Sequence, residues 1–267
     1  MTSLKTGISF YTIFLGLQQR EEQCINKLIT SFLKYSNDEE LVVLDQTLAS
    51  RRQVSADETL HLWELDKDAV KQNAGLTGFD KKINTEHFEQ KVIDNPGRLK
   101  IIQQNDNVLT HSRAINKILT EVCTTKWCVI LDSDIEFLNG AYFNDIVGII
   151  NSCPELAAIG EITDIPHGKN SPNYPFSQNK GDRMMRIHPM LIAINRESFI
   201  QHRMEFKLIQ FKAFKHEFEN IVGDCGASFL LQCALKNLSV YHLDSTKYIV
   251  HRARGSWGGA KIVYNSN

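Results

Sequence analysis

Short apolar runs alternate along the chain with stretches that carry apolar residues at helical spacing, and this alternation indicates the fold. Residues 8–15 are apolar and β-branched, which predicts a strand buried on both faces. Residues 19–33 place apolar side chains on one side of a helix. A second apolar run, 41–44, ends at Asp45. Strand, helix and strand in this order predict a parallel α/β unit with a right-handed crossover.

The same two patterns continue through the rest of the chain. Further strands are predicted at 99–103, 127–131, 157–162, 190–194, 240–243 and 248–250, and helices at 109–123, 143–150 and 225–235. The pattern weakens between 49 and 97, a charged insertion with helix-like pieces at 66–72 and 84–93. Residues 166–181 are rich in His, Gly, Asn, Ser and Pro and predict a long loop, a kind of segment that often covers or binds a ligand.

Composition and charge narrow the classes of partner. The chain has 267 residues, 42% of them hydrophobic and 23% charged, as is usual for a globular protein that buries a substantial core. Its formal net charge of -1 lacks the basic excess typical of nucleic-acid or anionic-membrane binding, so no nucleic-acid partner is expected. No apolar run is long enough to span a membrane, and any membrane contact is expected to be peripheral.

The cysteines favour a cytoplasmic location. None of the six forms the C-x-x-C spacing of a zinc or redox site, so we interpret them as reduced core thiols. The first residues also lack the basic region and the cleavage site of a signal peptide.

The segment VILDSDIEF places two acidic residues directly after the most apolar predicted strand. Ligands of open α/β sheets lie outside the carboxyl ends of the strands, so Asp132 and Asp134 occupy a suitable position for a site. Neighbouring carboxylates repel one another unless a cation neutralises them, and their oxygens are ligands that Mg²⁺ and Mn²⁺ prefer. Such a cation would stabilise a departing diphosphate. In the alternative interpretation, one of these residues only caps the next helix.

Two later residues could complete this chemistry. His251 follows the last predicted strand, and a neutral imidazole is a suitable third ligand for Mn²⁺. Asp224 precedes a predicted helix between two glycines and could accept a proton from an acceptor hydroxyl. A histidine at a strand end and an aspartate that caps a helix are the simpler alternatives.

The order of these features resembles the inverting GT-A glycosyltransferases of the family-2-like group. The features that carry the resemblance are, in chain order, the opening βαβ unit with Asp45, the helix HSRAINKIL, the DSD turn, Asp224 and His251. The resemblance implies an α/β, GT-A-like (Rossmann-like) fold, with a mixed, mainly parallel sheet flanked by helices. It implies one domain over residues 1–267, with a nucleotide-binding half at about 1–137 and an acceptor-binding half at about 138–267.

The resemblance also implies a role for each matching residue. Asp224 would be the catalytic base, and Asp132, Asp134 and His251 would bind Mn²⁺ or Mg²⁺. Nucleotide contacts would come from Thr12, Arg20, Asp45, Arg113, Asn116, Asp132 and Ser133. The chain departs from the group where Gly223-Asp224 replaces an acidic pair and where Gln46 and Thr47 follow Asp45.

The implied function is metal-dependent transfer of a sugar from a UDP- or GDP-sugar to an acceptor hydroxyl, with inversion. The acceptor would be a carbohydrate, a lipid-linked molecule or a protein. A retaining GT-A enzyme, which needs no base at Asp224, and a nucleotide-sugar-binding protein without turnover are the alternatives. A haloacid dehalogenase-type phosphatase fits less well, because Glu136 replaces the usual Thr or Val and the acidic motif lies in mid-chain. Phosphate-loop and dinucleotide-binding motifs are absent, which disfavours nucleotide kinases and NAD enzymes.

Overall fold

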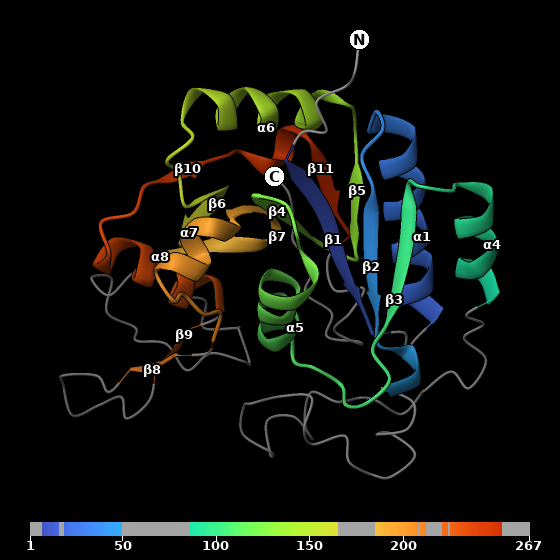
Figure 1. The fold of residues 1–267 in the computed structure, drawn as a ribbon, viewed down its shortest axis with the longest axis horizontal. Helices are drawn as coiled ribbons and strands as arrows, with labels where there is room; N and C mark the ends of the chain where they lie inside the picture. Colours follow the sequence, from blue (N-terminus) through green and yellow to red (C-terminus); the bar gives the residue numbers. More distant parts are fainter. Residues whose placement is uncertain are drawn as a thin grey trace, which may run out of the picture.

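A seven-stranded sheet forms the centre of the protein in the computed structural model, which describes residues 7–15, 19–49, 86–164, 185–207, 209–211, 221–223 and 225–252 (Figure 1). Its strands are β1 (Ile8–Phe14), β2 (Leu41–Asp45), β3 (Leu99–Gln103), β4 (Trp127–Asp132), β6 (Ala158–Asp164), β7 (Met185–Asn195) and β10 (Val240–His242). Their order is β10-β6-β7-β4-β1-β2-β3. Neighbouring strands are parallel, except that β7 is antiparallel to both β4 and β6. This mixed, mainly parallel sheet confirms the predicted fold class.

Two short antiparallel pairs lie outside the main sheet. β8 (Ile209–Phe211) pairs with β9 (Ile221–Gly223). β5 (Ile135–Phe137) pairs with β11 (Ile249–His251). Because β5 follows the turn at the end of β4, this second pair brings the end of β11 to the carboxyl edge of the main sheet.

Helices cover both faces of the sheet (Figure 1). They are α1 (Gln19–Tyr35), α4 (Glu86–Asp94), α5 (His111–Lys117), α6 (Ala141–Ser152), α7 (Arg196–Gln201) and α8 (Cys225–Leu235), with a π-helical turn η2 (Ile118–Val122) that continues α5 and a 3₁₀ turn η3 (Ser245–Lys247). One hydrophobic core takes side chains from α1 and α6, and the other takes side chains from α5, η2, α7 and α8. The sheet therefore separates two cores, as in other α/β proteins.

An aromatic cluster in the first core anchors β5. The ring of Phe137 lies 6.3 Å from that of Phe32 on α1 and 5.0 Å from that of Phe143 on α6, measured between centroids. Phe32 also packs edge-on against Phe10 of β1 at 5.3 Å. In addition, the amide N–H of Phe137 donates a hydrogen bond of 3.0 Å to Oγ of Ser31 on α1. The turn that precedes β5 therefore rests on the rigid core.

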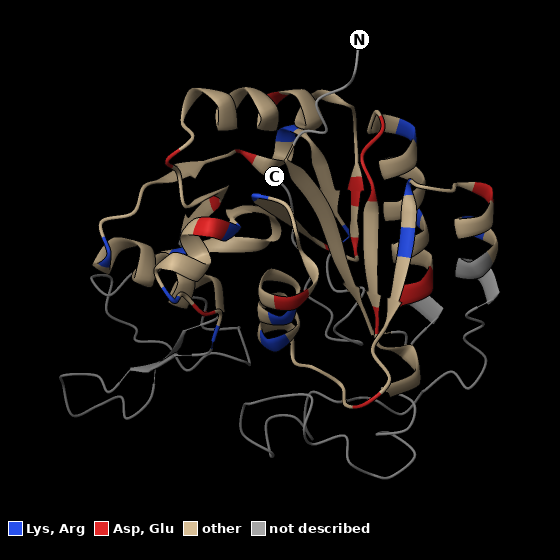
Figure 2. Ribbon diagram, viewed as in Figure 1, with Lys and Arg blue, Asp and Glu red and all other residues tan. Residues whose placement is uncertain are grey.

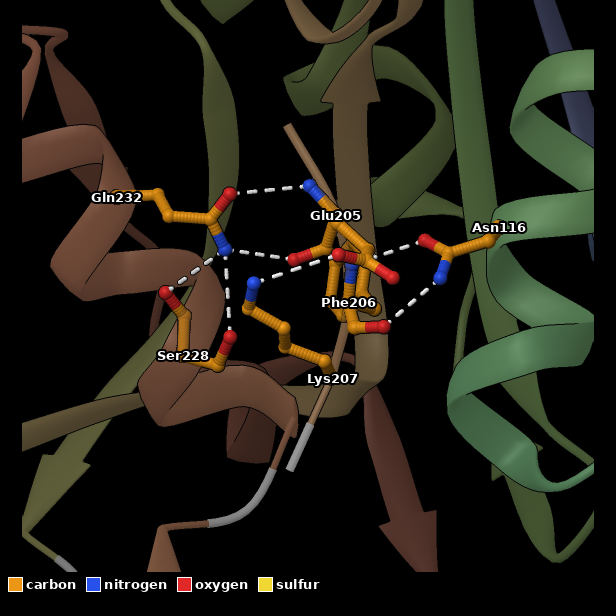
Figure 3. Close-up of polar contacts among 6 residues, drawn as sticks. All are labelled: Asn116, Glu205, Phe206, Lys207, Ser228 and Gln232. Carbon is orange, nitrogen blue, oxygen red and sulfur yellow. Dashed lines mark hydrogen bonds and ion pairs between the residues drawn. The ribbon is translucent and has the colours of Figure 1, made fainter. Parts of the chain in front are cut away.

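A group of polar contacts, here called the α5–α8 clamp, joins these two helices through residues 205–206 (Figure 3). The side-chain amide of Asn116 on α5 donates to the carbonyl oxygen of Phe206 and accepts from its N–H, both at 2.8 Å. The Gln232 side chain on α8 likewise accepts from the Glu205 N–H and donates to its carbonyl oxygen, at 3.0 and 2.6 Å. Phe206 stacks on Phe229 of α8, with the ring centroids 4.5 Å apart. The clamp fixes α8 relative to α5.

Most predicted elements are present, and the differences have physical causes. β7 begins at Met185, earlier than predicted, because its pairing with β6 continues past a register shift that accommodates Pro189. The predicted helix 109–123 begins at His111 and ends in the π-helical turn. β5 and α7 escaped prediction because three and six residues show no clear periodicity. The predicted helix-like piece 66–72 and loop 166–181 lie outside the described residues.

Basic and acidic residues are mixed on α1 and α4, whereas α8 carries neither (Figure 2). None of the helices in the described ranges combines the length and the apolar character that a bilayer crossing requires.

We expect Phe32→Ala to lower the free energy of unfolding by about 3–5 kcal/mol, because the truncation removes a fully buried ring from the aromatic cluster. Urea denaturation followed by circular dichroism measures this loss. Leu235→Ala is the control, because this side chain is 75% exposed and its truncation should change stability by less than about 0.5 kcal/mol. Equal losses in the two variants would contradict this description of the core.

Candidate functional site

The acidic residues predicted from the sequence lie in the turn between β4 and β5. Asp132 is the last residue of β4, and Ser133 and Asp134 form the turn. The apolar residues before them are buried in the sheet, so the chain turns where polar residues begin. The Asp134 side chain is only 4% exposed, whereas that of Asp132 is 22% exposed. Both carboxylates therefore lie at the carboxyl edge of the sheet, where ligands of such sheets bind.

Pairing between β5 and β11 brings His251 to the acidic turn from 117 residues away. His251 pairs in register with Ile135, next to Asp134. Its Nε2 lies 3.1 Å from Oδ1 of Asp134. The N–H of Arg252 donates to the carbonyl oxygen of Asp134 at 2.8 Å, which extends the ladder by one bond.

Asp132, Asp134 and His251 form a group that could hold a metal ion, with one ligand atom of each residue within 4.8 Å of the others. Ligands about 2.1 Å from an octahedral ion lie about 3 Å apart on adjacent positions. The 3.1 Å between Oδ1 of Asp134 and Nε2 of His251 suits such a pair, as it suits a hydrogen bond. Two carboxylates and an imidazole are ligands that Mn²⁺ accepts, so this donor set fits the predicted cation.

His111 is a site residue that the sequence did not identify. It begins α5, and its Nε2 lies 3.2 Å from Oδ1 of Asp132. Its imidazole also lies beside the thiol of Cys225, the first residue of α8. One feature of the sequence could have identified it: His111 starts a helix that follows a strand. Helices of α/β units often begin beside ligands at the carboxyl edge of the sheet.

A third imidazole lies next to His251. The ring of His188 on β7 stands 5.9 Å from the His251 ring, centroid to centroid. Nδ1 of His188 accepts a hydrogen bond of 3.3 Å from the N–H of Met190. His188 therefore lies close to the acidic turn, because His251 bonds Asp134.

These neighbours shift the pKa values of Asp132, His251 and His111. Burial alone would raise the pKa of Asp132, but the His111 hydrogen bond and the charges of His111, His251 and His188 lower it to about 2. Burial would lower the pKa of His251, yet its bond to Asp134 and the charges of both aspartates raise it above the usual value. In His111, bonds to Asp132 and Cys225 likewise outweigh burial and raise the pKa. Each carboxylate therefore has a positively polarised partner.

Asp45 lies at the end of β2, on the same edge of the sheet. One of its carboxylate oxygens accepts hydrogen bonds from the N–H and the hydroxyl of Thr47, at 2.9 and 2.5 Å. The other accepts from Nε2 of Gln103 at 3.0 Å. These bonds hold the buried carboxylate in one orientation beside the region where a nucleoside is expected.

The remaining predicted nucleotide contacts have varied positions. Thr12 is fully buried within β1, on the strand face shared with Phe10, and its hydroxyl makes no hydrogen bond to the described residues. Ser133 is buried in the acidic turn, and Arg113 is exposed in the first turn of α5. The side chain of Arg20 and the whole of Asp224 lie outside the described residues.

Asn116 contributes to the architecture of the site. Both polar groups of its side chain bond the Phe206 backbone in the α5–α8 clamp (Figure 3). Asn116 therefore has a structural role, while its contact with a nucleotide stays a prediction.

Comparisons with known proteins show similarity at the level of the fold. No protein-family model matches the chain, and a search of curated proteins finds no relative. Among solved structures, a mannosyltransferase from Pyrobaculum calidifontis in complex with GDP-Man and Mn²⁺ matches 94% of this chain with a TM-score of 0.53 and 12% identity. The chain has the GT-A fold.

Two further solved structures are less similar in TM-score. They are TarS 1–349 from S. aureus, at 0.49 with 15% identity over 91% of this chain, and the 4-diphosphocytidyl-2C-methyl-D-erythritol synthase from Anaerococcus prevotii, at 0.45 with 11% identity over 88%. The match covers 58% of the mannosyltransferase chain, 59% of the TarS chain and 87% of the synthase chain. This chain therefore spans less than two thirds of the mannosyltransferase and TarS chains.

We expect Asn116→Ala to lower the free energy of unfolding by about 1–3 kcal/mol, because it leaves the N–H and carbonyl of Phe206 without their partners. Thermal and urea unfolding measure the change, and Asn144→Ala on the exposed side of α6 is the matched control. Mn²⁺-dependent binding of UDP and GDP, measured on the folded variant, separates the two roles. A loss of nucleotide affinity without a loss of stability would favour the nucleotide contact.

Proposed function

We propose that this protein is a metal-dependent glycosyltransferase that moves a sugar from a UDP- or GDP-sugar to an acceptor hydroxyl, with inversion. The observation that carries the proposal is the convergence of Asp132, Asp134 and His251 at the carboxyl edge of a GT-A sheet. A diphosphate leaving group requires positive charge at that position, and this group of ligands can hold the cation that supplies it.

The nucleotide-sugar would bind along the carboxyl ends of β2 and β4. Asp45 and Asp132 end these strands, each held by hydrogen bonds from neighbouring side chains, and can accept bonds from nucleoside hydroxyls. Asp132, Asp134 and His251 would hold Mn²⁺ or Mg²⁺, which as a Lewis acid stabilises negative charge on the diphosphate. Arg113, exposed on α5, can add a charge-assisted hydrogen bond to a phosphate. Roles for Thr12, Arg20, Asn116 and Ser133 in nucleotide binding remain predictions.

Asp224 is the proposed general base. It would take the proton of the acceptor hydroxyl while that oxygen bonds the anomeric carbon and the bond to the nucleoside diphosphate breaks, which inverts the anomeric centre. The position of its neighbour supports this role. Cys225 lies beside His111, and His111 bonds Asp132, so the start of α8 is close to the acidic turn.

The fold comparison supports the choice of ligands to test. The solved mannosyltransferase structure contains GDP-Man and Mn²⁺, which are ligands of that protein. We propose UDP- and GDP-sugars as donors here, and a carbohydrate, lipid-linked molecule or protein as acceptor. The same proposal includes a single domain, with a donor half at about 1–137 and an acceptor half at about 138–267. It also includes a cytoplasmic location.

We expect Asp134→Asn and His251→Ala to weaken Mn²⁺ binding more than about 100-fold, because direct ligands should contribute more than the partners that orient them. Thermal shift with UDP or GDP, with and without Mn²⁺, measures the effect, since a ligand of the folded state raises the melting temperature. The exposed Asp106→Asn and the surface His202→Ala are matched controls and should bind like the wild type. Wild-type protein that gains no stability from any nucleotide with Mn²⁺ would refute the proposal.

Asp224→Asn should keep donor binding and lose about 10²–10⁴-fold in turnover, because the amide cannot accept the acceptor proton. Donor affinity by calorimetry and initial transfer rates give the two quantities separately. The anomeric configuration of the wild-type product, read by NMR, tests inversion. A product with retained configuration would instead support the retaining alternative, in which no base is needed at this position.

A further inference from the structure

His111 joins two parts of the candidate site that the sequence keeps far apart. Its imidazole bonds the carboxylate of Asp132 at the end of β4 and lies beside the thiol of Cys225 at the start of α8. We propose that His111 is a positioning residue, which orients Asp132 for the cation and sets the distance of the start of α8 from the acidic turn. This inference rests on the function proposed above.

The helix that carries His111 is fixed from both sides. Before it, the Gln46 side chain accepts a bond of 2.6 Å from the Leu109 N–H and donates one of 3.3 Å to the Leu109 carbonyl oxygen, which ties the approach of α5 to the end of β2. After it, Ile115 and Leu119 are fully buried in the second core. The imidazole therefore projects from backbone that is held at both ends.

Cys225, which lies beside His111, is also held in place by its surroundings. Cys225 is buried, and the α5–α8 clamp fixes its helix through Gln232 and Phe206. The clamp joins the far ends of the two helices, and the His111–Cys225 contact joins their first residues. Two contacts at opposite ends set both the spacing and the direction of α8 relative to α5. The start of α8 is thereby constrained relative to Asp132.

The hydrogen bond to Asp132 has a separate consequence for metal binding. A carboxylate has two oxygens, so a bond from His111 to Oδ1 restricts rotation of the group and allows Oδ2 to bind an ion. Groups that orient metal-binding side chains in this way commonly contribute about 10–100-fold to metal affinity or activity. His111 is itself two-fifths exposed, so it can be replaced without opening a large cavity in the core.

The test compares His111→Phe, which keeps a ring without a donor, with His111→Gln, whose Nε2 can still donate to Asp132. Free Mn²⁺ measured by electron paramagnetic resonance gives the affinity for Mn²⁺ alone, without turnover. We expect the Phe variant to bind Mn²⁺ about 10–100-fold more weakly and the Gln variant to recover most of this loss. His202→Phe on the surface is the matched control, and His111→Ala replaces the Phe variant if that variant melts early.

Transfer kinetics add a readout that a general loss of stability would not change in the same way. At saturating Mn²⁺, the Phe variant should show a lower kcat with a nearly unchanged KM for the donor, because the start of α8 is no longer held beside the reacting groups. Equal Mn²⁺ affinity in the wild type and the Phe variant would overturn the inference and leave the proposed function standing. Absence of Mn²⁺ binding by the wild type would overturn both.

Discussion

Repulsion between two carboxylates at the end of one buried strand is the constraint on which the site depends. Asp132 and Asp134 lie so close together that one ion could bind both, and Asp134 is almost fully buried. Such a pair is costly in a region of low dielectric unless positive charge lies nearby. Imidazoles from α5, β7 and β11 supply it, and each lies far from the others in sequence. The long-range contacts of the fold therefore meet at this turn.

The fold meets this constraint by attaching the acidic turn to the core. Phe137, three residues after Asp134, packs into the aromatic cluster, and Ser31 of α1 accepts a bond from its N–H. A three-residue strand such as β11 has little stability of its own. Its partner β5 is anchored, and Ile249 of β11 is buried in the same core. The ladder can then hold His251 in place, although its own hydrogen bonds are few.

The sequence predicted the strands, the acidic turn and the contribution of His251, because these follow from apolar runs and from the place where each run ends. It did not reveal His111, since a helix pattern identifies the buried face and does not show which polar residue meets a strand end. A strand pattern likewise does not show which of its residues reaches a ligand: Thr12 is fully buried, and its contact with a nucleotide stays a prediction. β5 was too short for a periodic signal, so the route by which His251 reaches Asp134 also had to come from the structure.

A shared fold does not determine chemistry, so the argument for function rests on the site. The carboxylates of Asp45 and Asp132, at two strand ends of the central sheet, are held by side chains from adjacent elements. α8 meets this edge of the sheet at Cys225, which lies beside His111, and is joined to α5 by the α5–α8 clamp. The chain after α8 returns to the same place, because β11 pairs with β5 and carries His251 to Asp134. The acidic turn is therefore held from two sides, by α5 through His111 and by β11 through His251. A change that shifts either element would move an imidazole away from its carboxylate.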